Sequence, residues 1–178
     1  MCIDMVEYEV TIPTGVEVHV DKHHVEVKGP KGTLKRDMVF EGVKHEIKDG
    51  KLVLSMKEPR TKQKAVLGTM AAHIRNMVVG VSKGYIYKLK IVFAHFPINA
   101  SVEGKRFVIK NFSGEKKPRF ADILGDTKVK IEGQEVFVEG IALEEVSQTA
   151  ANIETATKIR GKDLRVFSDG IYITNKAE

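Results

Sequence analysis

The stretch VDKHHVEVKGPKG (residues 20–32) is repeated in outline 82 residues later as VEGKRFVIKNFSG (residues 102–114). Both stretches begin with valine and end with glycine, and Lys28 corresponds to Lys110. Apolar residues also recur at the same two positions, as Val25 and Val27 in the first stretch and as Phe107 and Ile109 in the second. Self-similarity at a fixed offset is typical of duplicated units. The pattern therefore predicts one small domain that occurs twice in tandem.

Alternating apolar residues outside this stretch indicate further strands in the first half. Apolar and polar residues alternate in EYEVTI (residues 7–12) and in VEVHV (residues 16–20), as expected for half-buried strands. The sequence GPKG (residues 29–32) favours a turn, because proline lacks a backbone donor and glycine accepts unusual backbone angles. Leu34 then begins a further short strand. The dipeptide DG (residues 49–50), between alternating runs, predicts a two-residue hairpin.

After Pro59 the apolar residues follow steps of three and four, which indicates one apolar face of a helix. We expect about five turns, with Gly80 and Gly84 at the end of the helix. The face comprises Val66, Leu67, Met70, Ile74, Met77, Val78 and Val81.

The second half repeats this order of elements. We expect strands at residues 85–93, around Val102, and at residues 107–109, 129–131 and 136–138, with Gly133-Gln134 as a hairpin turn. A polar loop spans residues 111–118. The second helix is expected to bury Leu143, Val146, Ala150, Ile153 and Thr157. Asp169-Gly170 is expected to join two final strands, LRVF (residues 164–167) and IYIT (residues 171–174).

These patterns predict an α+β fold made of two tandem copies of a small domain, each an antiparallel sheet packed against one helix. We place the N-terminal repeat at residues 1–82 and the C-terminal repeat at residues 83–178. A unit of this size can fold alone around a thin core.

Composition limits the possible classes of protein. The 178 residues are 42% hydrophobic and 30% charged, as in a soluble globular protein, and the net charge of +5 favours a polyanionic partner. Acidic residues near the N-terminus and the lack of a long apolar run predict a cytosolic protein with no membrane partner. Cys2 is the only cysteine, so an internal disulfide is impossible.

Motifs for catalysis are missing from the sequence. It contains no phosphate-binding loop of the G-x-x-x-x-G-K-[ST] type and no G-x-S-x-G motif, so we expect no cofactor and no small-molecule substrate. His19, His23 and His24 are better explained as exposed residues at strand ends than as metal ligands. An acidic stretch could hold a carboxylate pair, although solvated charge and a favourable helix dipole also explain it. It comprises Glu132, Glu135, Glu139, Glu144 and Glu145.

Basic residues gather in two segments of the second half. Residues 103–119 hold six cations and two acidic residues, and the segment after the second helix holds four cations. If the polar loop and this segment meet, they form one cationic surface that would bind phosphates. Asn111, Ser113 and Gly114 add donors for a sugar-phosphate chain, and Phe112 could either stack on a base or pack inward. On charge alone, an ordinary solvated lysine-rich surface remains an equal alternative.

Several longer stretches resemble a known family. VKGPKGTLKRD (residues 27–37), NMVVGVSKGY (residues 76–85), NFSGEKKPR (residues 111–119) and KDLRVFSDGIYI (residues 162–173) are similar to the universal large-subunit ribosomal protein L6, in its archaeal and eukaryotic branch and closer to the archaeal side. The resemblance covers nearly the whole chain. Its most specific part is R-x-F-x-D-G-I-Y-I, followed by Lys176. The chain departs from the family at Ser113, where a larger apolar residue is expected.

The resemblance implies two copies of one α+β domain and a structural protein rather than an enzyme. It further implies that the C-terminal domain binds large-subunit rRNA near the sarcin-ricin loop. The N-terminal domain would point toward the stalk base, with other ribosomal proteins beside it and translation factors nearby, in the cytoplasm. The turn at Gly29 and Gly32 is expected to be structural. The candidate RNA contacts are Arg106, Lys110, Asn111, Gly114, Lys116, Lys117, Arg119, Lys158, Arg160, Lys162, Arg165 and Lys176.

Other functions remain possible at this point: a non-ribosomal RNA-binding module, a protein adaptor built from the two sheets, or a small enzyme that uses the acidic hairpin.

Overall fold

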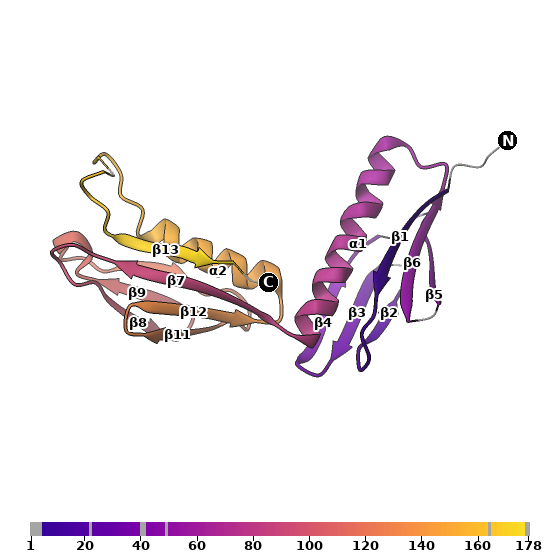
Figure 1. The fold of residues 1–178 in the computed structure, drawn as a ribbon, viewed down its shortest axis with the longest axis horizontal. Helices are drawn as coiled ribbons and strands as arrows, with labels where there is room; N and C mark the ends of the chain where they lie inside the picture. Colours follow the sequence, from indigo (N-terminus) through magenta and orange to yellow (C-terminus); the bar gives the residue numbers. More distant parts are fainter. Residues whose placement is uncertain (1–4, 22, 40–41, 49, 164, 177–178) are drawn as a thin grey trace. The chain divides into compact units, whose positions relative to one another are not determined.

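The chain forms two compact units, one up to Gly84 and one from Tyr85 onward (Figure 1). The computed structural model describes residues 5–21, 23–39, 42–48, 50–163 and 165–176, so Cys2 lies outside it. Each unit contains one long helix and two antiparallel sheets. Neither of the long helices in the described ranges is long and apolar enough to span a membrane.

The N-terminal unit contains six strands and then its helix. One sheet has the order β1-β6-β5 and the other the order β2-β3-β4, and every pairing is antiparallel. The elements are β1 (Met5–Thr11), β2 (Glu17–Val20), β3 (His24–Gly29), β4 (Gly32–Asp37), β5 (Lys44–Lys48), β6 (Lys51–Lys57) and α1 (Thr61–Ser82).

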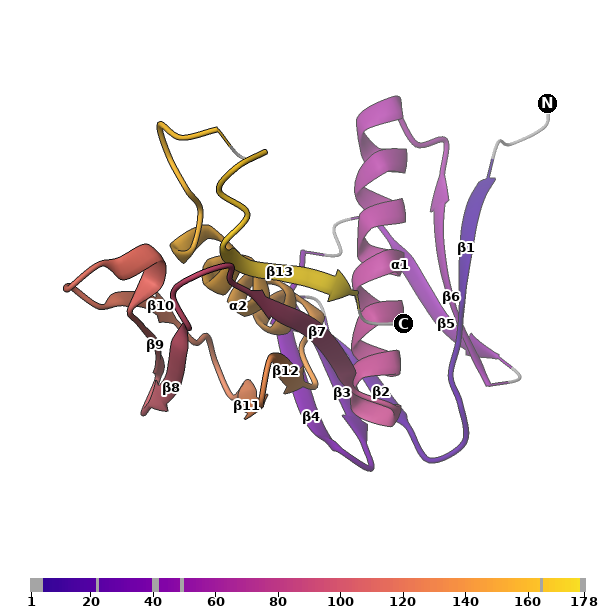
Figure 2. The same ribbon diagram turned by 60° about the vertical axis from the view of Figure 1, so that its left-hand side comes forward.

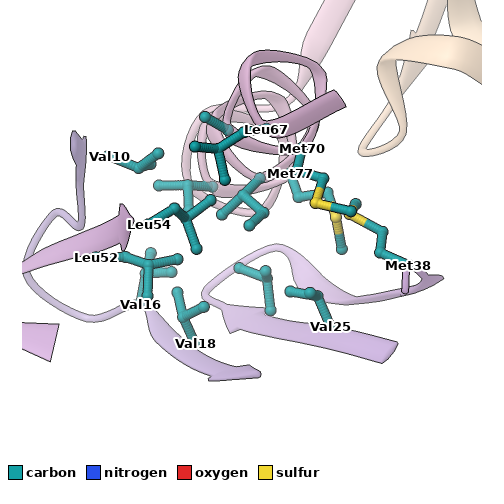
Figure 3. Close-up of a cluster of buried hydrophobic side chains, with 14 of the residues drawn as sticks. Val10, Val16, Val18, Val25, Met38, Leu52, Leu54, Leu67, Met70 and Met77 are labelled. Carbon is teal, nitrogen blue, oxygen red and sulfur yellow. The ribbon is translucent and has the colours of Figure 1, made fainter. Parts of the chain in front are cut away.

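Alternation along the strands builds the core of this unit. Val10, Leu52 and Leu54 from one sheet and Val18 and Val25 from the other are buried together against α1 (Figure 3). The helix begins with a hydrogen bond of 2.8 Å from the Arg60 backbone N–H to the Gln63 side chain. This core explains why one face of β1, β2, β3 and β6 had to be apolar, whereas all five residues of β5 are exposed.

Two expectations for α1 were wrong in detail. Val66 is 53% exposed, because the buried face of the helix begins one residue later, at Leu67. Gly80 is a buried residue inside the helix and does not end it. The helix ends after Ser82, where Gly84 has a φ of 76° and its backbone N–H donates to the Val79 carbonyl at 3.3 Å. A positive φ favours glycine at that position.

The turn at residues 29–32 packs on the C-terminal end of α1. A Cβ atom on Gly29 would lie 2.7 Å from Cγ2 of Val81, so only glycine fits there. The Lys31 backbone N–H donates to the Val81 carbonyl at 3.0 Å, and the Lys31 ammonium donates to the carbonyl of Lys83. These contacts are consistent with the expected structural role of the turn.

The C-terminal unit repeats this arrangement and adds a strand. Its sheets have the orders β10-β9-β8 and β11-β12-β7-β13 (Figures 1 and 2). The elements are β7 (Tyr85–Val92), β8 (Asn99–Glu103), β9 (Arg106–Lys110), a 3-10 turn (Phe112–Gly114), β10 (Arg119–Asp122), β11 (Lys128–Glu132), β12 (Glu135–Gly140), α2 (Leu143–Ala156) and β13 (Gly170–Asn175).

The predicted duplication of an α+β unit is confirmed. The order β1-β6-β5 recurs as β7-β12-β11, and β2-β3-β4 recurs as β8-β9-β10. Two features go beyond the prediction: each unit has two sheets where one was expected, and β13 adds a strand at the free edge of β7. Strand β10 was also missing from the predicted elements.

The predicted final hairpin was wrong. Residues 165–167 are not a strand, and Leu164 lies outside the described residues. The Asp163 carbonyl accepts hydrogen bonds from the N–H groups of Val166 (3.1 Å) and Phe167 (3.0 Å), so a local turn uses the donors that a strand pairing would need. Asp169 does not occupy a hairpin turn, because its buried carboxylate accepts the Ala94 N–H at 2.8 Å.

Candidate nucleic-acid interface

The loop at residues 111–118 follows β9 and has an unusual backbone. Asn111, Ser113 and Gly114 have φ values of 60°, 49° and 78°, in the left-handed region that few side chains adopt. The Asn111 amide donates to the Pro97 carbonyl at 3.1 Å. Phe112 is only 1% exposed, so it packs inward and offers no ring for a base. The loop is therefore fixed from within, and its middle faces solvent.

Arg119 joins this loop to the end of α2. Its guanidinium donates to both carboxylate oxygens of Glu115, at 2.9 and 2.5 Å. Nη1 donates to the carbonyls of Ala156 (3.0 Å) and Lys158 (3.4 Å), and Cζ lies 4.2 Å from the centre of the Phe112 ring. We call these contacts the Arg119 clamp. A cation at the C-terminal end of a helix also stabilises the helix dipole.

The clamp changes the acidity of Glu115. The hydrogen bonds from Arg119 are the main cause that lowers the pKa of this carboxyl group. Burial opposes them, and the charges of Arg119 and Lys162 lower the pKa further. Glu115 therefore stays ionised within a cationic neighbourhood. Because Arg119 contacts both Glu115 and the carbonyl of Lys158, the segment after α2 lies close to the loop.

The polar loop and the segment after α2 thus meet. This contact is the condition under which we expected their basic residues to form a single cationic surface. Figures 1 and 2 show both at the same end of the unit. The exposed cations brought together there form what we call the cationic surface. It comprises Lys116, Lys117, Lys158, Arg160, Lys162 and Arg165. In the described part of the chain, neither Lys158 nor Arg160 has a carboxylate partner within ion-pair distance, which leaves both charges available to a ligand.

Within the segment after α2, Lys162 lies over the ring of Phe167, 4.8 Å from its centre. Arg165 is exposed, and its backbone N–H donates to the Asp163 carboxylate at 2.9 Å. The Thr157 hydroxyl anchors the start of the segment, because it accepts the Ile171 N–H at 3.0 Å and donates to the Glu154 carbonyl at 3.1 Å. Local turns and one buried hydroxyl thus hold the cations in place.

Some predicted contacts lie away from the cationic surface. Arg106 and Lys110 lie on β9 and form ion pairs across the sheet with Asp122 and Glu103, each at 3.5 Å. Lys176 follows the end of β13, whereas the segment after α2 leads into the beginning of that strand. At about 3.3 Å per residue, the first and last of the six residues of β13 lie roughly 17 Å apart.

Three residues important for this geometry were not among the candidates. Glu115 was counted only as an opposing charge, and Thr157 only as part of an apolar helix face. Asp169 was assigned to a turn. The partners of Thr157 and Asp169 are 14 and 75 positions away and meet them only in the folded unit, so the sequence carries no signal for these contacts. Glu115 lies only four positions before Arg119, so the spacing of this pair is visible in the sequence.

The acidic stretch does not form a site in the structure. Glu139 pairs with Lys130 at 3.2 Å on the β11–β12 hairpin. Glu144 and Glu145 lie in the first turn of α2, where negative charge stabilises a helix, and Glu145 accepts the Asp126 N–H at 3.4 Å. These three carboxylates therefore have separate structural explanations, and the remaining two, Glu132 and Glu135, are exposed register partners at the β11–β12 turn.

Known proteins share this duplicated fold unit in their sequences. A family model described as Ribosomal protein L6 matches residues 12–84 and again residues 96–170. The chain is 51% identical to the large ribosomal subunit protein uL6 of Methanosarcina mazei, over 94% of this chain and 96% of the relative. It is 50% identical to the protein of the same name from Desulfurococcus amylolyticus, over 96% and 94% of the two chains, and 50% identical to that from Aeropyrum pernix, over 92% and 91%.

Proposed function

The chain belongs to the ribosomal protein L6 family, and from this membership we propose that its C-terminal unit binds large-subunit rRNA near the sarcin-ricin loop, beside the site where translation factors act. Members of this family are structural constituents of the large ribosomal subunit and not enzymes. The archaeal relatives are named as proteins of the large ribosomal subunit, and the proposal gives this chain the same location, on the ribosome in the cytoplasm. In this proposal the N-terminal unit points toward the stalk base and its proteins.

The observation that carries the proposal is the cationic surface. Its two segments come from distant parts of the sequence, and the Arg119 clamp holds them in one position. Fixed cations bind a phosphate chain with little loss of conformational entropy, and each neutralised phosphate releases counterions. Cations on a flexible loop would lose more conformational entropy when they bind the phosphate chain.

Mechanistically, the protein stabilises an RNA fold by holding phosphates at a set spacing. Lysine ammonium groups neutralise single phosphates, whereas the planar guanidinium groups of Arg160 and Arg165 can each hold two phosphate oxygens. Asn111 and Gly114 belong to the same loop as Lys116 and Lys117, and the absence of a side chain at Gly114 leaves the backbone of the loop accessible.

Binding to an RNA fragment that carries the sarcin-ricin region tests the proposal. We expect the purified protein to bind this fragment more tightly than a scrambled duplex, with an affinity that falls steeply as salt concentration rises. Equal and weak binding to both RNAs, together with no sedimentation with large ribosomal subunits, would rule out the proposed site and favour an adaptor that binds proteins.

A double variant tests the surface itself. Replacing Arg160 and Lys162 with alanine should weaken binding and flatten its salt dependence while the circular dichroism spectrum stays unchanged. The matched control replaces Lys128 and Lys130, which lie on β11 and carry the same total charge. Equal effects of the two double variants would mean that binding follows net charge and not this surface.

A further inference from the structure

A hollow lies beside the cationic surface, between strand β10 and the end of α2. It is lined by Pro118, Arg119, Phe120, Thr155, Ala156, Lys158 and Arg160. No acidic side chain is among these lining residues. The hollow therefore combines apolar groups, against which a base can pack, with cationic groups, which can bind a phosphate.

Phe120 is the aromatic residue of this hollow. It lies within β10, opposite Val108 of β9, and it is 54% exposed although Val108 is only 2% exposed. Phe112 is buried beneath Arg119. Phe167 and Phe96, which lie near the cationic surface, are 40% and 48% exposed, but neither lines this hollow. Phe120 is thus the ring at this place that an unpaired base can reach.

Charges around the hollow favour a phosphate group. Lys158 and Arg160 are exposed, and neither has a carboxylate partner within ion-pair distance in the described ranges. The carbonyl end of a helix normally repels an anion, but Arg119 donates to the Ala156 and Lys158 carbonyls and so offsets that repulsion.

We propose that this hollow is a nucleotide subsite, in which one unpaired base of the bound RNA stacks on Phe120 while Lys158 and Arg160 hold the adjoining phosphate. The inference rests on the proposed RNA-binding function and makes it more specific. A paired base in a duplex has both faces covered by its neighbours, so the subsite selects an unpaired nucleotide.

The chain contains no tryptophan, which allows a direct test by fluorescence. In the variant Phe120→Trp the new indole is the only tryptophan, and a base stacked on it should quench its emission. We expect quenching upon addition of the sarcin-ricin RNA fragment, with the same midpoint as binding followed by the anisotropy of labelled RNA. The control Phe137→Trp places the indole on β12 and should show no change.

Two further variants separate stacking from charge. Phe120→Leu should weaken binding roughly ten-fold, because stacking on an aromatic ring is lost, and should leave the salt dependence unchanged, because no charge is removed. Phe120→Tyr keeps the ring and should bind within about two-fold of the original protein.

The outcomes distinguish this inference from the function on which it rests. If the RNA binds tightly but Phe120→Trp is not quenched and Phe120→Leu binds normally, the subsite is wrong and the cationic surface stands. Equal quenching by a fully paired duplex would also overturn the subsite. If no RNA binds, both proposals fail.

Discussion

Arg119 connects three parts of the C-terminal unit through one guanidinium group. It contacts Glu115 of the loop, the ring of Phe112 beneath the loop, and the carbonyls at the end of α2. Its side chain is only 28% exposed. The residue was expected to contact RNA, and that expectation is untested, but its donors are already used within the protein. We infer that Arg119 acts mainly by positioning the cations around it.

Arg119→Lys tests the clamp while keeping the charge. A lysine cannot donate to a carboxylate in the two-pronged geometry and to two carbonyls at once, so we expect the free energy of unfolding to fall by about 1 to 2 kcal/mol. Urea unfolding followed by circular dichroism measures the change. Arg106→Lys is the control, because Arg106 is 68% exposed and makes one ion pair of 3.5 Å, and it should change stability by less than about 0.5 kcal/mol. Similar losses in both variants would contradict the clamp.

Glu115 gives the clamp a pH dependence. Its pKa is lower in the folded protein than the ordinary 4.5, so the folded state favours the ionised carboxylate. The contribution is therefore present above pH 4.5 and is lost as the pH falls through the lowered pKa. We expect the original protein to be more stable than Glu115→Gln at neutral pH, and the difference to shrink below pH 4.5. A difference that stays constant down to pH 2 in urea titrations would show that this carboxylate does not titrate as inferred.

At the level of elements, the two helices differ in length. α1 has 22 residues and α2 has 14. The chain between α2 and β13 includes the segment that carries four of the surface cations, and β13 then returns it to the sheet beside β7. A helix as long as α1 would have placed Lys158, Arg160 and Lys162 in regular structure. The shorter α2 and the added β13 thus create the cationic surface within a duplicated fold.

Thr157 holds the junction between α2, the segment after it and β13. Its buried hydroxyl accepts the Ile171 N–H at 3.0 Å. Thr157→Val keeps the shape but leaves that N–H without a partner in the core, so we expect a loss of about 1 to 3 kcal/mol in the free energy of unfolding. Thr155→Val changes an exposed threonine two positions earlier and serves as the control. Thermal and urea unfolding should show a loss in the first variant alone; a loss of equal size in both would point to helix propensity as the cause.

The sequence predicted most elements because they follow simple periods. Alternation identified the β11–β12 hairpin, and steps of three and four identified both helices. Strand β10 was missed because its four residues, RFAD, are too short to show a period. The duplication contained a signal for it, since β10 corresponds to β4 in the first unit. Residues 164–167 had a strand-like composition, but the turn at Asp163 determines their structure in the described part.

Over the whole molecule, the same order of strands and helix occurs in both units, but only the C-terminal unit carries the cationic surface defined above. In both units, the link after β3 or β9, the middle strand of a three-stranded sheet, leads to a contact with the C-terminal end of the helix. Lys31 within the link makes this contact in the first unit, and Arg119 at the start of β10 makes it in the second. The repeat predicted this common scaffold. It did not predict that the polar loop and the segment after α2 would meet, because that contact depends on the folded position of Arg119 and on the path of the chain after Thr157. Composition indicated only that the chain could bind a polyanion.

The two halves carry similar net charges, +2 up to residue 82 and +3 from residue 83, so net charge alone would let either bind RNA. Replacing Lys116 and Lys117 with alanine removes two charges from the cationic surface, whereas replacing Lys62 and Lys64 removes two charges from the exposed start of α1. If the arrangement of cations matters, the first double variant should lower RNA affinity roughly ten-fold and reduce the salt slope by about 1.5, since each lost phosphate contact lowers it by about 0.7 to 0.9. The second should change both quantities little.

Affinity measured by filter binding at several salt concentrations separates these cases, because both double variants have the same net charge. A salt slope that falls equally in both would mean that the RNA responds to the total charge of the protein. A fall confined to the change at Lys116 and Lys117 would mean that the geometry set by the Arg119 clamp, and not the surplus of basic residues, makes the C-terminal unit the RNA-binding part of the molecule.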